Sequence, residues 1–128
     1  MTLAQLNTAT AAENQLDPQQ IALLRSLRNG ALLPQLLRTY RDQAARQIEE
    51  IRSAVNDADH EAVRVIAHTL KSASFSIGAT RLGELCAQLE ANARQQALDK
   101  SSSLCDELDE CFAALLPEIT QYLAPQAP

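Results

Sequence analysis

Apolar side chains recur every three or four residues along most of this 128-residue chain, with charged side chains between them. The longest such stretch runs from Leu33 to Val55, where one apolar stripe is flanked by arginine and glutamate. This spacing places the apolar groups on one side of an amphipathic α-helix. No stretch alternates between apolar and polar residues as a half-buried strand would. The pattern therefore predicts an all-α fold.

Three further stretches repeat this spacing, and each predicts one more amphipathic helix. Their expected inward stripes are Val63, Ile66, Ala67, Leu70, Ser74 and Ile77; Leu82, Leu85, Cys86, Leu89 and Ala93; and Leu104, Leu108, Cys111, Leu115, Ile119 and Tyr122. Asp59 is placed to cap the first of these helices, and Gly78 to separate it from the second. A turn at 97–100 and caps at 101–103 precede the third. Pro117 must kink that helix or begin a new turn, because its ring clashes with the preceding turn.

The start of the chain gives weaker signals. Residues 1–16 are rich in Ala, Thr, Asn and Gln, and either a frayed arm or a short docked helix fits them. Asp17 followed by Pro18 is typical of a helix start. That helix is expected to end at 29–30, an Asn-Gly pair. Its expected apolar face consists of Ile21, Leu23, Leu24 and Leu27.

Four long helices joined by short links favour an antiparallel four-helix bundle, with one or two short extra helices at the start. We expect residues 17–123 to form this single domain and the tail at 124–128 to be disordered. No apolar run approaches the roughly 20 residues that cross a bilayer, so we expect no membrane insertion. We also expect a monomer.

Charge and cysteine content exclude some function classes. Residues 1–98 carry ten acidic and ten basic side chains, so the net charge of −5 arises from residues 99–128. A chain without a cationic footprint is not expected to bind nucleic acid. The odd number of cysteines and their spacing argue against a disulfide framework or a zinc site. Together with the lack of a signal-peptide core, they predict a cytoplasmic location. The cysteines are Cys86, Cys105 and Cys111.

His68 stands outside the inward stripe of its helix. At about 100° per residue, the inward side chains lie within roughly 60° of Val63, whereas His68 lies at about 140° and points to solvent. An exposed histidine on a helix is common and by itself indicates no function. Here Lys71 lies one turn on, small residues leave the ring uncrowded, and Phe75 offers an apolar docking element. The outer sector also contains Arg64 and Ser72.

These neighbours suit a phosphoryl carrier. A neutral imidazole is a good nucleophile near pH 7, and a phosphoryl group attached to it needs a cation such as Lys71. Glu90 lies at about 80° on the next helix, at the edge of its buried stripe. It is either an ordinary boundary carboxylate or the acceptor for Nδ1–H of His68, which would leave Nε2 free to attack.

The stretch AHTLKSASFSIGATRLGELCAQLE, residues 67–90, resembles the signature of the histidine-containing phosphotransfer (HPt) domain, a helical-bundle module of bacterial phosphorelays. The residues that fit are His68, Leu70, Lys71, Gly78, Ala79, Leu82, Leu85, Cys86, Leu89 and Glu90. The resemblance extends more loosely from Leu16 to about Leu123. Ser72 departs from the glycine most common in the family, but serine keeps the approach to the ring nearly as open.

The resemblance implies a role for each of these residues. His68 would accept the phosphoryl group, Lys71 would neutralise it, Glu90 would orient the imidazole, and Gly78 would allow the tight passage between the two central helices. The partners would be receiver domains of response regulators or hybrid kinases, whose aspartates exchange the phosphoryl group reversibly with His68. The receiver would supply Mg²⁺, so this chain would need no cofactor or metal of its own. The expected docking residues are Arg64, Ser72 and Phe75.

The same sequence also bears on three other functions: an enzyme that uses ATP, a helical adaptor and a metal-binding bundle. The three glycines form no phosphate-cradling loop, which predicts a carrier rather than an enzyme that uses ATP. A helical adaptor that docks a receiver or kinase without carrying phosphate remains an alternative. A metal-binding bundle is disfavoured, because His60 and His68 are eight residues apart and lack a Glu-x-x-His motif. A free-standing protein and a carboxyl-terminal module of a hybrid sensor kinase both fit the pattern.

Overall fold

The computed structural model describes residues 16–123, and every element it assigns there is helical. The elements are α2 (Pro18–Arg25), the 3₁₀ helix η1 (Leu27–Gly30), α3 (Leu32–Asn56), α4 (His60–Ser76), α5 (Thr80–Arg94) and α6 (Ser101–Leu123). The prediction of an all-α fold is confirmed. The expectations for the arm before residue 16 and for the tail at 124–128 concern residues outside this described part of the chain.

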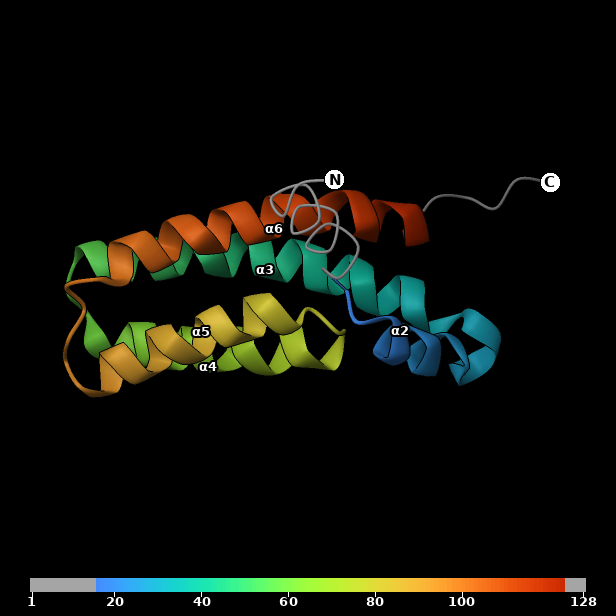
Figure 1. Ribbon diagram of the computed structural model, residues 1–128, viewed down its shortest axis with the longest axis horizontal. Helices are drawn as coiled ribbons and strands as arrows, with labels where there is room; N and C mark the ends of the chain where they lie inside the picture. Colours follow the sequence, from blue (N-terminus) through green and yellow to red (C-terminus); the bar gives the residue numbers. More distant parts are fainter. Residues whose placement is uncertain (1–15, 124–128) are drawn as a thin grey trace, which may run out of the picture.

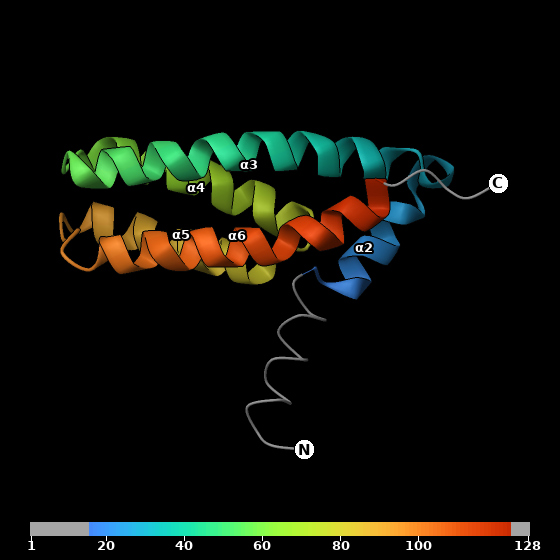
Figure 2. The same cartoon turned by 90° about the horizontal axis from the view of Figure 1, so that it is seen from above.

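Helices α3 to α6 form an antiparallel four-helix bundle (Figures 1 and 2). Helix α3 packs against α4 and α6, and α5 packs against the same two helices. Short links force consecutive helices to run in opposite directions, as predicted. The four apolar stripes meet in one core, whose fully buried large side chains include Leu37, Ile51, Leu70, Leu82, Leu89, Leu108, Leu115 and Ile119.

Local signals fix both ends of α4, the helix that carries His68. Asp59 accepts a hydrogen bond from the backbone amide of Ala62 (3.1 Å) and so satisfies one of the amides that a helix start leaves unpaired. At the other end Gly78 has a φ of 86°, a left-handed conformation that glycine adopts without strain. The chain therefore reverses sharply there, and α4 and α5 pack side by side.

Helix α2 packs against the turn between α4 and α5 (Figure 1). The backbone amide of Asp17 donates to the carbonyl of Gly78, and the side-chain amide of Gln20 donates to the carbonyl of Ser76, both at 2.8 Å. A Cβ atom at Gly78 would lie 3.2 Å from the Asp17 nitrogen and from Gln20 Cβ. Glycine at this position is thus favoured by the close approach of α2 as well as by its backbone conformation.

The first helix is shorter than the sequence predicts. It ends at Arg25 rather than at 29–30, and the 3₁₀ turn that follows contains two residues with left-handed backbone, Arg28 and Asn29. Its expected apolar face is accordingly wrong in part: Ile21 and Leu24 are buried, whereas Leu23 and Leu27 are exposed. So short a helix presents only one narrow face to the core, and Leu27 lies beyond its end.

Helix α6 continues through Pro117 as one element. Its last turns, red in Figure 2, lean away from the line of its first part, so a bend rather than a new helix accommodates the proline. The helical donor that proline lacks would have paired with Ala113, which is exposed, so water can hydrogen-bond that carbonyl. Across residues 16–123, none of the helices combines the length and apolar character needed to span a membrane.

Candidate functional site

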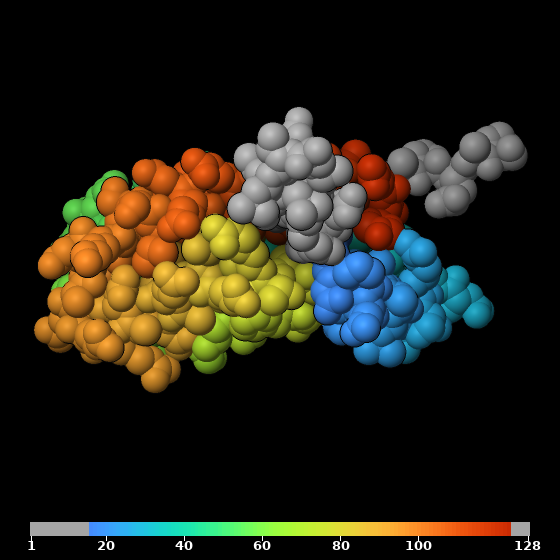
Figure 3. All heavy atoms as spheres, viewed as in Figure 1, coloured from blue at the N-terminus to red at the C-terminus, as the bar shows by residue number. Residues whose placement is uncertain are grey.

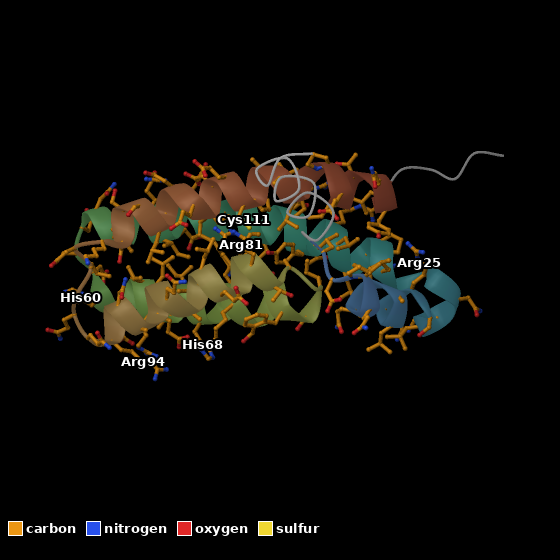
Figure 4. All side chains as sticks on the ribbon, in the orientation of Figure 1. Arg25, His60, His68, Arg81, Arg94 and Cys111 are labelled. Carbon is orange, nitrogen blue, oxygen red and sulfur yellow. The ribbon has the colours of Figure 1, made fainter. Side chains whose placement is uncertain are left out.

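The carboxylate of Glu90 gathers three nitrogen-bearing side chains on the outer surface of α4 and α5. Its Oε2 lies 2.9 Å from Nδ1 of His68 and 3.0 Å from Nη2 of Arg94, and its Oε1 accepts from Nζ of Lys71 at 2.7 Å. Figure 4 shows His68 and Arg94 along the same edge of the molecule. The antiparallel packing of α4 and α5 thus produces the contact that the sequence predicts between Glu90 and the imidazole.

These four side chains differ greatly in exposure. Glu90 is 5% exposed and Lys71 26%, whereas His68 and Arg94 are 56% and 61% exposed. A carboxylate withdrawn from water is stable as an ion only when it is paired and hydrogen-bonded, and Glu90 has three such partners. The acceptor is therefore held by three partners below the surface, while the imidazole that contacts it is exposed to solvent.

The charge state of Glu90 follows from two opposing effects. Burial alone would raise its pKa, because it removes water from the charged form. Hydrogen bonds from Lys71 and His68 outweigh burial, and the pKa of Glu90 lies below its ordinary value. Glu90 is thus an ionised acceptor at neutral pH. A carboxylate of this kind favours the His68 tautomer with its proton on Nδ1, which leaves the lone pair on Nε2.

The cluster carries a surplus of positive charge. The single carboxylate of Glu90 faces two permanent cations, Lys71 and Arg94, even when His68 is neutral. An oriented imidazole beside a cationic surplus is suited to accept a group that brings negative charge, such as a phosphoryl group.

The other residues singled out from the sequence lie around this cluster. Arg64 is ion-paired with Glu61 one turn earlier on α4, so part of its charge is already compensated. Ser72 is exposed on the same helix. Phe75 is 43% exposed, and its ring lies against the backbone of Gly83 on α5. All three remain accessible on the side of α4 that carries His68, and their docking role remains a prediction.

Sequence reasoning missed Arg94. The signal that could have found it is its spacing, because residues four apart on a helix share a face, and Arg94 lies four residues after Glu90. A basic residue in the last turn of a helix also has an ordinary explanation, since it interacts favourably with the helix dipole. Only the burial of Glu90 distinguishes a partner of that carboxylate from an ordinary basic residue at a helix end.

The remaining histidine and the cysteines lie elsewhere. His60 begins α4, and its Nδ1 is buried without a hydrogen-bond partner. Within residues 16–123, no group of three or more His, Cys, Asp or Glu side chains is placed to hold a metal ion. The three cysteines are buried, as expected for small apolar residues, and burial raises the pKa of Cys86 to about 12.

Known proteins resemble this chain in sequence and fold. The family model of the Hpt domain matches residues 35–118, a span that contains α4 and α5. The structure is similar to that of histidine-containing phosphotransfer protein B (HptB) from Pseudomonas aeruginosa PAO1, with a TM-score of 0.79, 27% identity, and coverage of 84% of this chain and 92% of that one. No curated protein matches the chain.

A second solved structure, from rice, is described as that of a candidate histidine-containing phosphotransfer protein. Its TM-score is 0.76 at 21% identity, and the match covers 95% of this chain and 94% of that one. At this identity the likeness concerns the fold alone.

Proposed function

This chain belongs to the Hpt domain family, and from that premise we propose that His68 is the residue that carries the phosphoryl group. Histidine phosphotransfer in a phosphorelay is the function of the chain. The observation that supports His68 as the acceptor is its 2.9 Å contact, through Nδ1, with the buried carboxylate of Glu90. Of the two histidines in the sequence, His68 is the one whose ring is oriented by an ionised partner and exposed to solvent.

The reaction needs no proton transfer. Nε2 of neutral His68 attacks the phosphorus of an aspartyl phosphate, the N–P bond forms as the P–O bond breaks, and the aspartate leaves as a carboxylate. The ring then carries a positive charge and keeps its proton on Nδ1, which donates a hydrogen bond to Glu90. Glu90 therefore stabilises the charge that develops on the ring, and the reverse reaction passes through the same contacts.

Lys71 and Arg94 supply the charge that the phosphoryl oxygens need. A charge pair at 4 Å is worth about 1 kcal/mol in water and about 4 kcal/mol at a partly shielded surface. The contribution of both cations should therefore grow when a partner covers the site and excludes water.

The partner in this proposal is a receiver domain, which supplies both the aspartate and the Mg²⁺. Arg64, Ser72 and Phe75 would contact it, because they surround His68 on the exposed side of α4. The chain would act as a cytoplasmic monomer, and it would take its phosphoryl group from the receiver and not from a nucleotide.

The test is phosphotransfer from a ³²P-labelled receiver domain to the intact chain, with each histidine replaced in turn. His68→Gln should abolish the acid-labile label, whereas the matched control His60→Gln should keep it. Label that survives in His68→Gln would contradict the proposal. Receiver binding without any transfer to the unaltered chain would instead support the adaptor function.

A further inference from the structure

A buried glycine in the middle of α5 has no backbone reason to be glycine. Gly83 lies within a regular helix, and its φ is not in the left-handed region that requires this residue. Glycine inside a helix is destabilising relative to alanine. Some other feature must compensate for that cost.

The compensating feature is the ring of Phe75, which comes from α4. A Cβ atom at position 83 would lie 2.8 Å from Cε1 and 2.9 Å from both Cδ1 and Cζ of that ring. The missing side chain thus forms a notch on α5 in which the ring rests. Nevertheless 43% of Phe75 stays exposed, so the notch supports the ring without hiding it.

The position of Phe75 relative to His68 gives this exposure a consequence. Phe75 follows His68 by seven residues, which places its backbone about 10.5 Å further along α4 and only about 20° off the same line. Even a small transient interface of about 600 Å² per partner corresponds to a disc of about 14 Å radius. A protein that brings an aspartate to His68 therefore covers Phe75 as well.

Other exposed apolar side chains support this placement. Val65, one turn before His68 on α4, is 46% exposed, so apolar surface lies on both sides of the histidine along the helix. In Figure 3 the surfaces of α4 and α5 lie together on one side of the bundle, with α2 beside them at one end. The remaining large exposed apolar residues of the described chain, Leu23 and Leu27, belong to α2 and η1.

We propose that Phe75, whose ring is positioned by Gly83, is a specificity-determining contact for the receiver domain. This inference rests on the proposed function, because it takes His68 as the point at which the partner's aspartate arrives. The receiver that fits carries an apolar side chain beside its aspartate, where it meets the ring. Phe75 makes the contact, and Gly83 is a positioning residue that acts only through it.

The experiment measures phosphotransfer from a panel of receiver domains charged with acetyl phosphate, as a function of receiver concentration. With the fastest receiver, Phe75→Ala should lower kcat/KM roughly tenfold, as expected when an aromatic contact at an interface is lost. The loss should appear in KM and leave the maximal rate within about twofold. Leu27→Ala is the matched control, since Leu27 is 42% exposed and lies on η1, outside the two helices that carry His68 and Gly83.

Gly83→Ala tests the positioning role without deleting the ring. Its better helix propensity offsets the cost of displacing Phe75, so the melting temperature should change little, while kcat/KM for the same receiver should fall severalfold. In a Phe75→Ala background, Gly83→Ala should cause no further loss. Equal losses in both backgrounds would show that Gly83 acts independently of the ring, and would overturn that part of the proposal.

A small phosphodonor separates this inference from the proposed function. Phosphoramidate needs no docking surface, so it should phosphorylate His68 at the same rate in the unaltered chain, Phe75→Ala and Gly83→Ala. Failure with the unaltered chain would count against the proposed function itself. Normal labelling by phosphoramidate together with unchanged receiver kinetics in Phe75→Ala would overturn only the docking proposal. A change in oligomeric state with Phe75→Ala would also overturn it, since the ring would then pair two copies of this chain.

Discussion

Within residues 16–123, two clusters join three or more charged or titratable side chains, and they are built in opposite ways. Near His68, one carboxylate that is 5% exposed accepts from three nitrogen-bearing side chains. On the α3–α6 face, one arginine, Arg52, donates to two carboxylates, Asp106 at 2.9 Å and Asp109 at 2.5 Å. There the arginine is 35% exposed and the aspartates are 66% and 52% exposed.

The difference in burial decides what each cluster can do. Exposed ion pairs are hydrated and screened by salt, so each contributes little to stability. The hydrogen bonds that Arg52 donates to Asp109 and Asp106 raise the pKa of Arg52, but arginine is already charged at any physiological pH. The Arg52 cluster therefore links two helices without controlling chemistry. Buried Glu90 depends on its partners for its charge, and that charge favours the His68 tautomer with its proton on Nδ1.

Removal of the buried acceptor should have the largest effect. Glu90→Ala deletes a charge-assisted hydrogen bond to the ring, worth about 1.5–3 kcal/mol. If that energy is needed in the transition state, receiver-to-His68 transfer should slow by about 10-fold to 100-fold. Rapid-quench transfer assays measure this directly. Glu90→Gln keeps an acceptor oxygen but loses the charge, so it should lose less activity than Glu90→Ala, and equal losses in the two variants would contradict an orienting role.

The two cations around Glu90 should differ in importance. Lys71 is more buried than Arg94, so its charge is less screened by water. Lys71→Ala should therefore slow transfer and shorten the phosphohistidine lifetime more than Arg94→Gln does, by roughly tenfold against roughly threefold. Arg94→Lys should recover part of the loss, and a larger effect at Arg94 than at Lys71 would reverse the ranking that burial predicts.

The pH dependence of the free energy of unfolding should show that the buried carboxylate of Glu90 is ionised in the folded chain. The pKa of Glu90 is lower in the folded chain than its ordinary value, so the folded state favours the ionised form. Its contribution to stability is present above the ordinary glutamate pKa of about 4.3 and is lost as the pH falls through the folded value. Urea unfolding between pH 6 and pH 3 should show a steeper loss for the unaltered chain than for Glu90→Gln. Parallel curves would contradict the lowered pKa.

The exposed cluster should give the smallest effect. Arg52→Ala removes both contacts to α6. The free energy of unfolding, measured with urea, should nevertheless fall by only about 0–1 kcal/mol, because water and salt screen these exposed pairs. Transfer to His68 should stay within error of the unaltered chain. A loss of several kcal/mol in the free energy of unfolding would show that the exposed cluster contributes more to stability than its exposure predicts.

Much of this arrangement could be predicted from the sequence, because the determinants are local. Periodicity identifies the four bundle helices, and Asp59 and Gly78 mark the ends of α4 through capping and backbone conformation. Helix angles place Glu90 where it can approach His68 once the two helices are taken as antiparallel, and the family resemblance assigns it to the imidazole. Each of these steps needs only the spacing of residues along one helix or across one turn.

The features that escaped prediction depend on contacts between elements. A glycine inside a helix does not indicate which side chain occupies the space beside it. The packing of the Phe75 ring against Gly83 is therefore visible only in three dimensions. The early end of α2 at Arg25 likewise contradicts an Asn-Gly stop signal that appears sound on local grounds. Arg94 resembled an ordinary residue of a helix end until the burial of Glu90 was known.

The central claim is that Glu90 holds Nδ1 of His68 and thereby directs the phosphoryl group to Nε2. Long-range ¹H–¹⁵N NMR of the ¹⁵N-histidine-labelled chain, phosphorylated with phosphoramidate, tests it most directly, because the chain has only two histidines to assign. The account predicts a phosphoryl group on Nε2 of His68, a protonated Nδ1 on the same ring, and an unmodified His60. Phosphorylation at Nδ1 of His68, or on His60, would contradict it.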